Sequence, residues 1–200
     1  MRALSRLSQA ISEGDGISVI PVLDGDVSEQ AALAEEAGAE AVAVGSAAEA
    51  ARARAGTGLP ILVREPRADA AQADGCVLVF EELGDGERLE QLHARALAEG
   101  LDCVVDVRDE EELAEVLERI DPQIILISER DQDRDEEALE RTLDLLPDVP
   151  AGKLVISESG PIAREQVLAL ERAGVDAVLV SPRASEVQAV VTELTGGRRL

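Results

Sequence analysis

The sequence predicts an α/β protein of one domain, a compact TIM (β/α)8 barrel with a short N-terminal helix. Two observations carry this prediction. Short apolar runs alternate about eight times with polar segments of helical period. One design, a helix that ends in glycine followed by an acidic residue and a strand, recurs as EAGAEAV, AEGLDCV and RAGVDAV. The alternative that this alternation leaves open is a doubly wound open sheet.

The expected strands are nearly all apolar, as parallel strands are when helices cover one side and a barrel interior lies on the other. They are ISVIPVL (17–23), AVAVG (41–45), PILVRE (60–65), CVLVFE (76–81), DCVVDV (102–107), QIILIS (123–128), KLVISES (153–159) and AVLVS (177–181). Expected helices include SEQAALAEEAGA (28–39), GERLEQLHARALAEG (86–100), DEEELAEVLERI (109–120), DEEALERTLDLL (135–146) and REQVLALERAG (164–174).

The domain is expected to span residues 1–200, with a helical segment over 1–14 and the barrel over 15–198. Leu4, Leu7 and Ile11 recur at helical spacing and predict a helix near residues 2–12. Few residues remain between the third and fourth strands, so little room is left there for a helix.

The core is predicted to consist of aliphatic side chains. Hydrophobic residues make up 46% of the chain, and Phe80 is its only aromatic residue. Val, Ile and Leu suit buried parallel strands, so the composition agrees with the barrel. Cys76 and Cys103 open two expected strands without the spacing of a zinc site or a disulfide framework. We therefore expect both to be small core residues.

The chain is strongly acidic, with 42 Asp and Glu against 19 Lys and Arg and a net charge of −23. Nucleic acids and anionic membranes bind clustered cations, so this charge excludes both as partners. An acidic surface with a single lysine is typical of a halophilic protein, because concentrated salt screens self-repulsion. The alternative is the acidic proteome of a GC-rich genome. Since the sequence shows no membrane-spanning run and no signal segment, we expect a soluble, cytoplasmic protein.

Polar residues end the strand that reads SESG, residues 157–160. Barrel enzymes keep their chemistry at the carboxyl ends of the strands, so Glu158, Ser159 and Gly160 are candidate ligand-facing residues. The alternative is a strand-end turn that caps the next helix, with Pro161 in the first helical turn.

Basic residues also lie at expected strand ends. Arg64, Arg130 and Arg183 form either a cationic mouth or surface ion pairs, which contribute little to stability. His93 falls within an expected helix and is interpreted as a residue of that helix's face.

Several segments resemble indole-3-glycerol phosphate synthase. The stretch KLVISESGPIA (153–163) is similar to the family's SESGI motif, and GVDAVLVSP (174–182) to its GVDAVLVG motif. LPILVREP (59–66) and DCVVDVRDEEEL (102–113) resemble its LPVLRKDFI and LVEVH…EEL segments. The resemblance runs over residues 17–193 and is strongest after residue 101. The family makes the indole ring of tryptophan by decarboxylating and closing a phosphorylated carboxyphenylamino-deoxyribulose.

The resemblance implies a set of site residues. That reaction needs a cationic general acid, carboxylates that move protons and a cradle for the phosphate. The family's SESG glutamate matches Glu158, with Ser159 and Gly160 beside it as phosphate-facing residues. Its strand-five glutamate matches Asp106, one methylene shorter, and its strand-six asparagine falls on Ser128. From the residues alone, Asp106 could equally be an ion-pair partner of a neighbouring arginine, Arg64 or Arg108.

The sequence departs from the family pattern at other positions. The general-acid lysine falls on Arg64, and an arginine holds an anion but does not readily release a proton. The first-strand glutamate and lysine fall on Val22 and Asp24. The last phosphate turn, Gly-Ser in the family, is Ser181-Pro182, where the proline lacks a backbone N–H.

The one lysine of the chain, Lys153, precedes its strand and is expected at the opposite, stability face of the barrel. Two hypotheses remain. In one, the chain is a degenerate paralogue that lost its lysine general acid and binds a phosphorylated ligand or a protein partner. In the other, it is an active, divergent synthase that uses Glu158, Asp106 and Arg64. Neither hypothesis requires a cofactor or a metal ion.

Salt adaptation can be tested by thermal unfolding. Thermal melts of the chain in low and in multimolar KCl should show a higher melting temperature in concentrated salt, because screening removes the repulsion among the acidic side chains. A melting temperature that is equal or higher at low salt would contradict salt adaptation.

Overall fold

The computed structural model describes residues 5–14, 16–65, 71–84, 86–128, 135–159 and 162–197. Its strands confirm the expected ones, with most boundaries shifted by a residue or two. They are β1 (Ser18–Pro21), β2 (Val42–Val44), β3 (Ile61–Val63), β4 (Gly75–Val79), β5 (Asp102–Val107), β6 (Ile124–Ile127), β7 (Leu154–Ser159) and β8 (Ala177–Val180).

The eight strands form one parallel sheet that curls into a barrel. Sequential strands pair from β2 to β8, and β8 pairs in parallel with β1. A single bridge between Val22 and Ala43 joins β1 to β2 and brings the two ends of the sheet together. The predicted TIM barrel is therefore confirmed, and an open doubly wound sheet is wrong.

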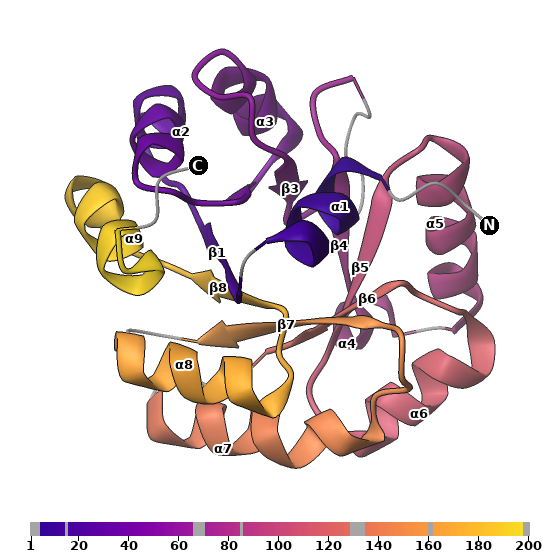
Figure 1. Cartoon of the computed structure of the whole chain (residues 1–200). Helices are drawn as coiled ribbons and strands as arrows, with labels where there is room; N and C mark the ends of the chain where they lie inside the picture. The colour runs from indigo at the N-terminus through magenta and orange to yellow at the C-terminus, as the bar shows by residue number, and fades with distance from the viewer. Residues whose placement is uncertain are drawn as a thin grey trace.

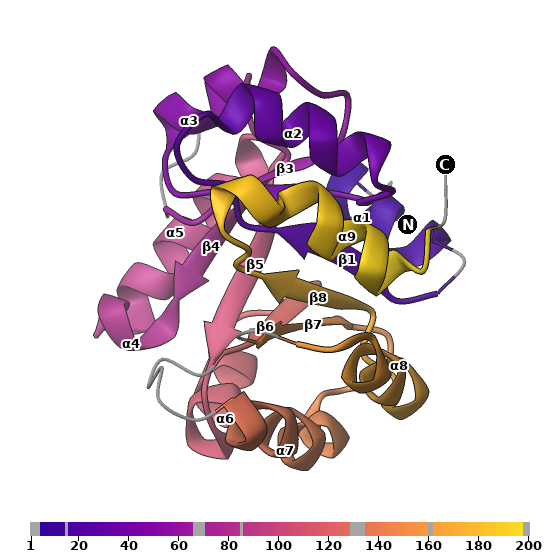
Figure 2. The same cartoon turned by 90° about the vertical axis from the view of Figure 1, so that its left-hand side faces the viewer.

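Helices surround this barrel (Figure 1). From the side, α2, α3 and α9 cover one flank, and α6, α7 and α8 cover the other (Figure 2). The helices are α1 (Arg6–Glu13), α2 (Val27–Glu36), α3 (Ala47–Arg54), α4 (Phe80–Leu83), α5 (Gly86–Ala98), α6 (Glu110–Arg119), α7 (Asp135–Leu145), α8 (Arg164–Ala173) and α9 (Val187–Thr195).

The expected strand CVLVFE (76–81) extends two residues beyond the end of the observed strand β4. Phe80 and Glu81 were expected in a strand, but they open α4, because β4 already ends at Val79. As expected, the described residues between β3 and β4 contain no helix.

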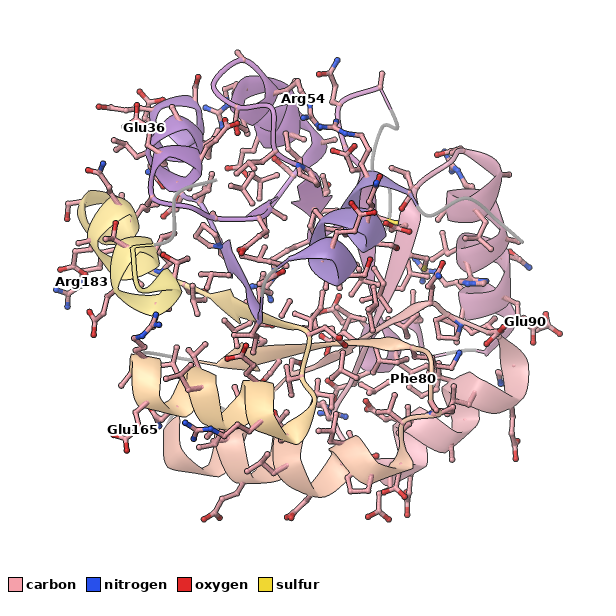
Figure 3. The ribbon with its side chains drawn as sticks, viewed as in Figure 1. Glu36, Arg54, Phe80, Glu90, Glu165 and Arg183 are labelled. Atoms are coloured by element: carbon pink, nitrogen blue, oxygen red, sulfur yellow. The ribbon has the colours of Figure 1, made fainter. Side chains whose placement is uncertain are left out.

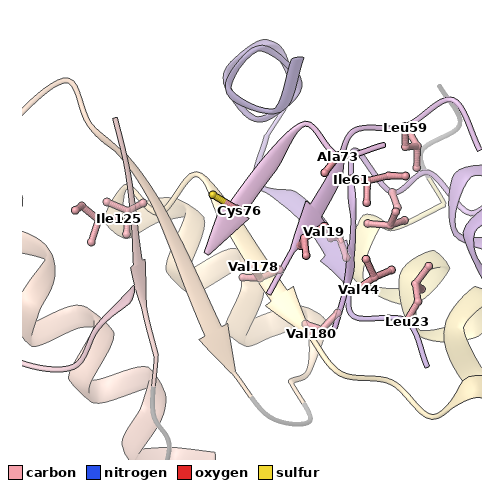
Figure 4. Close-up of a cluster of buried hydrophobic side chains, with 14 of the residues drawn as sticks. Val19, Leu23, Val44, Leu59, Ile61, Ala73, Cys76, Ile125, Val178 and Val180 are labelled. Atoms are coloured by element: carbon pink, nitrogen blue, oxygen red, sulfur yellow. The ribbon is translucent and has the colours of Figure 1, made fainter. Parts of the chain in front are cut away.

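Side chains alternate between two apolar layers, as the pleat of a strand requires. One layer fills the barrel interior, and it includes Ile20, Leu62, Val104, Leu126, Ile156 and Leu179. The other lies between the strands and the outer helices, where Val19, Val44, Ile61, Cys76 and Val178 pack together (Figure 4). Both cysteines belong to this outer layer, so the expectation of buried core residues is confirmed.

The repeated helix–glycine–acid–strand design has a structural reason. Glu40, just before β2, accepts a hydrogen bond of 2.9 Å from the backbone N–H of Val19 in β1. Asp176, just before β8, accepts one of 2.7 Å from the N–H of Val155 in β7. Burial raises the pKa of Asp176, and the bond from Val155 offsets part of that increase. In both cases the acid ties the start of its own strand to the start of its neighbour.

The third acid of the repeat, Asp102, holds α1 instead. Its carboxylate accepts hydrogen bonds from the backbone N–H and the hydroxyl of Ser8, at 2.8 and 2.9 Å, and from the Ser5 hydroxyl. In Figure 1, α1 lies within the ring of outer helices, over one end of the barrel. Leu7 and Ile11 of α1 are buried with the interior layer. Helix α1 therefore closes the amino-terminal end of the barrel.

Gly75 leaves the space that the Leu7 side chain of α1 occupies. A Cβ atom at Gly75, the first residue of β4, would lie 2.8 Å from the Leu7 side chain. Other charged side chains lie on the outer surface: the labelled Glu36, Glu90, Glu165 and Arg183 point away from the barrel (Figure 3). Within the described ranges, no helix is long and apolar enough to cross a membrane.

The packing of α1 predicts a large stability effect. Leu7 is fully buried, so Leu7→Ala should lower the free energy of unfolding by about 3 kcal/mol through lost burial and a cavity. The matched control is Leu143→Ala, because Leu143 is 36% exposed and its truncation should change stability by no more than about 0.5 kcal/mol. Urea unfolding measures both, and equal losses would show that α1 does not seal the barrel.

Candidate functional site

Polar residues gather at the carboxyl end of the barrel, which we call the mouth. Each stands two positions after an interior apolar residue, so the alternation of the strand aims it toward the barrel axis. The mouth residues are Arg64 after β3, Asp106 in β5, Ser128 after β6, Glu158 in β7 and Ser181 after β8.

An ion pair spans the mouth. Arg64 Nη1 lies 2.7 Å from Glu158 Oε1, and Arg64 Nη2 donates a hydrogen bond of 3.1 Å to Glu158 Oε2. β3 and β7 are four strands apart in a ring of eight, so the two side chains reach across the opening from opposite walls. The side chains are 33% and 18% exposed. This two-point contact fixes the guanidinium plane against the carboxylate.

Beside this pair lies a buried carboxylate. Asp106 is 2% exposed, and the Ser128 hydroxyl donates a hydrogen bond of 2.5 Å to its Oδ1. β5 and β6 are neighbouring strands, so this contact closes one wall of the mouth without crossing it. A buried carboxylate needs such donors, because a charge taken out of water without partners is costly.

Both predicted partners of Asp106 pair with other acids. Arg64 bonds to Glu158, while Arg108 bonds to Glu112 at 2.7 Å and to Glu81 at 2.9 Å. Sequence reasoning missed the Arg64–Glu158 contact. The sequence does indicate that both side chains face inward, because each lies two residues after an interior apolar residue. It does not show which residue on the opposite wall the arginine contacts.

The ends of β7 and β8 lie side by side. Ser159 pairs in register with Val180, so Ser181 follows directly beside the end of β7. Ser181 is exposed, while Gly160, the other predicted phosphate-facing residue, lies outside the described residues. The alternative that SESG caps the following helix is wrong: α8 begins at Arg164, with Ala163 as its N-cap.

Four further positions singled out from the sequence are not members of this set of mouth residues. Arg183 is 85% exposed and pairs with Glu186, so it forms a surface ion pair, and Arg130 lies outside the described residues. Val22 packs against the interior layer at the end of β1, while Asp24 is exposed. Val22 and Asp24 therefore supply neither of the groups, a glutamate carboxylate and a lysine ammonium, that the family has at these positions.

Lys153 lies at the other end of the barrel, as expected. It precedes β7, and its Nζ lies 2.5 Å from Asp121 and donates a hydrogen bond of 2.8 Å to the carbonyl of Pro122. Because Lys153 is the only lysine of the chain, no lysine reaches the mouth.

The described mouth therefore offers one cation already paired, two carboxylates and two hydroxyl groups. Arginine stays protonated at every physiological pH, so Arg64 can hold a negative group but does not readily deliver a proton. Across the described part of the chain, no three His, Cys, Asp or Glu side chains are grouped to hold a metal ion.

Comparison with known families gives a clear match. The family model described as indole-3-glycerol phosphate synthase matches residues 63–194, more than half of the chain. This range contains Arg64, Asp106, Ser128 and Glu158, and it begins after β1 and β2. An indole-3-glycerol phosphate synthase from Geobacillus sp. (strain WCH70) is 35% identical over 125 residues, which cover 61% of this chain and 48% of that protein. The chain thus spans about half the length of that curated relative.

Solved structures share the fold. A thiamine phosphate pyrophosphorylase from Pyrococcus furiosus superposes with a TM-score of 0.69 at 21% identity, covering 90% of this chain and 94% of the other. A mutant tryptophan synthase alpha-subunit from the same organism gives 0.67 at 18% identity, with 90% and 98% covered. At such low identity these likenesses concern the barrel architecture and not the chemistry.

Proposed function

Because the chain belongs to the indole-3-glycerol phosphate synthase family, we propose that it is a non-catalytic member of that family, which holds a phosphorylated small molecule at its mouth without converting it. The observation that carries the proposal is the Arg64–Glu158 ion pair across the mouth. Since LPILVREP resembles the family's LPVLRKDFI segment, we infer that Arg64 stands at the position of the general-acid lysine. A group that could release a proton would then be replaced by one that does not.

The ion pair also engages the second residue that the reaction would need. Glu158 corresponds to the glutamate of the family's SESG motif, and both of its oxygens face the Arg64 guanidinium. A substrate would therefore have to displace the guanidinium to reach either oxygen of Glu158.

The phosphate is expected at the ends of β7 and β8. Ser159 ends β7 and Ser181 directly follows β8, and backbone N–H groups at such ends can bind an anion. Pro182 contributes no N–H there, so fewer donors remain than the family motif provides.

An active synthase is the second candidate, because both carboxylates, Asp106 and Glu158, remain in the mouth layer. In that case Arg64 would stabilise negative charge electrostatically, and another group would have to protonate the substrate. The two candidates differ in one observable, the formation of the indole ring.

The test combines turnover with binding. At high protein concentration, the phosphorylated carboxyphenylamino-deoxyribulose should give no increase in indole fluorescence, since Arg64 stands where the family has its general-acid lysine. Calorimetry with the same compound and with inorganic phosphate should nevertheless detect binding. Indole formation by the unaltered chain would reject the proposal that the protein is non-catalytic. Calorimetry that detects no binding of either compound would reject the proposal that it holds a ligand.

A pair of charge variants locates the phosphate. Ser181→Asp places a carboxylate at the mouth and should weaken binding at least about tenfold, because like charges brought together cost several kcal/mol. Ser12→Asp makes the same change on α1 at the far end of the barrel and should leave binding unchanged. Equal affinities for the two variants would place the phosphate elsewhere.

A further inference from the structure

Cys76 and Cys103 are paired across two strands of the barrel. Cys76 in β4 stands in direct register with Cys103 in β5. Neighbouring strands lie about 4.8 Å apart, and disulfides join residues whose Cα atoms are about 4.4–6.8 Å apart, so the spacing permits a bond between the two. Both side chains belong to the outer apolar layer, so they lie on the same face of the sheet. Figure 4 shows Cys76 on β4 within that layer.

The two thiols also interact. The neighbouring Cys103 thiol lowers the pKa of the Cys76 thiol, and the same contact together with burial raises the pKa of Cys103 well above its usual value. Cys76 therefore gives up its proton more readily than Cys103 does.

One of these cysteines, which is 3% exposed, lines a pocket of the molecule. The pocket has a volume of about 710 Å³ and opens at the amino-terminal end of the barrel, opposite the mouth. Its walls are one face of α5 and the turns that precede β5, β6 and β7, with His93, Asp121 and Lys153 among the lining residues. Cys103 lines this pocket, and Cys76 does not.

We propose that Cys76 and Cys103 are a peroxide-sensitive dithiol, in which Cys103 reacts first through the pocket and Cys76 then closes a cross-strand disulfide. The proposal is independent of the mouth and of the function assigned to it. Proteins of a reducing compartment that form such bonds use them transiently, as redox-responsive sites.

The reaction has two steps. The Cys76 thiolate takes the proton of the neighbouring Cys103 thiol, and the Cys103 sulfur attacks one oxygen of hydrogen peroxide. The O–O bond breaks, and hydroxide leaves to become water with the proton that Cys76 had released. Cys103 is then a sulfenic acid. The Cys76 sulfur attacks the Cys103 sulfur, the S–O bond breaks, and the hydroxyl leaves as water with the Cys76 proton. Two thiols are oxidised and one peroxide is reduced to two waters.

Mass spectrometry of the full chain tests the proposal. After exposure to hydrogen peroxide, the chain is denatured in N-ethylmaleimide. The expected product has lost two hydrogen atoms, carries no maleimide and yields a linked Cys76–Cys103 peptide, while dithiothreitol restores two maleimide adducts. Two adducts after oxidation, covalent dimers, or a sulfinic acid on Cys103 beside a free Cys76 would overturn it.

Two matched variants test the order of reaction. In Cys76→Ser, dimedone should label Cys103, because its sulfenic acid has no partner to resolve it. In Cys103→Ser, Cys76 should stay unlabelled, since it does not line the pocket. Labelling of Cys76 but not of Cys103 would contradict entry through the pocket. The unaltered chain keeps the disulfide measurement valid even if a variant folds poorly.

Discussion

The alternation of inward-facing and outward-facing side chains along each strand constrains the rest of this barrel. Each strand sends every second side chain to the interior, and a shift by one residue would exchange the inner and outer faces of the whole strand. Leu62, Leu126 and Ile156 fill the middle of the barrel, and α1 seals its amino-terminal end with Leu7 and Ile11. The inward positions at the carboxyl end are left open, so polar side chains meet there.

At that open end, opposite charges set the chemistry that is available. Arg64 and Glu158 come from opposite walls and neutralise each other at two contacts, while Ser128 satisfies the more deeply buried Asp106. Partly buried pairs of this kind hold a geometry more than they add stability. A mouth fixed in this way suits the proposed retention of a ligand better than the repeated gain and loss of protons.

Local sequence predicted the architecture well and the contacts less well. The eight strands, the buried cysteines and the position of Lys153 follow from apolar runs and their order along the chain. The end of β4 at Val79 was missed, because Phe80 prolongs the apolar run although the backbone already turns into α4. The partner of Arg64 was missed because it is 94 residues away, and the closure of the barrel decides that contact.

We propose that a paired arginine stands where the family reaction requires a proton donor. The most direct measurement is the rate of indole formation by the variant Val22→Glu/Asp24→Lys/Arg64→Lys, which restores the three family residues, compared with that of the unaltered chain. We expect turnover by the variant and none by the unaltered chain. A rate for the unaltered chain that equals or exceeds the rate of the variant would contradict it.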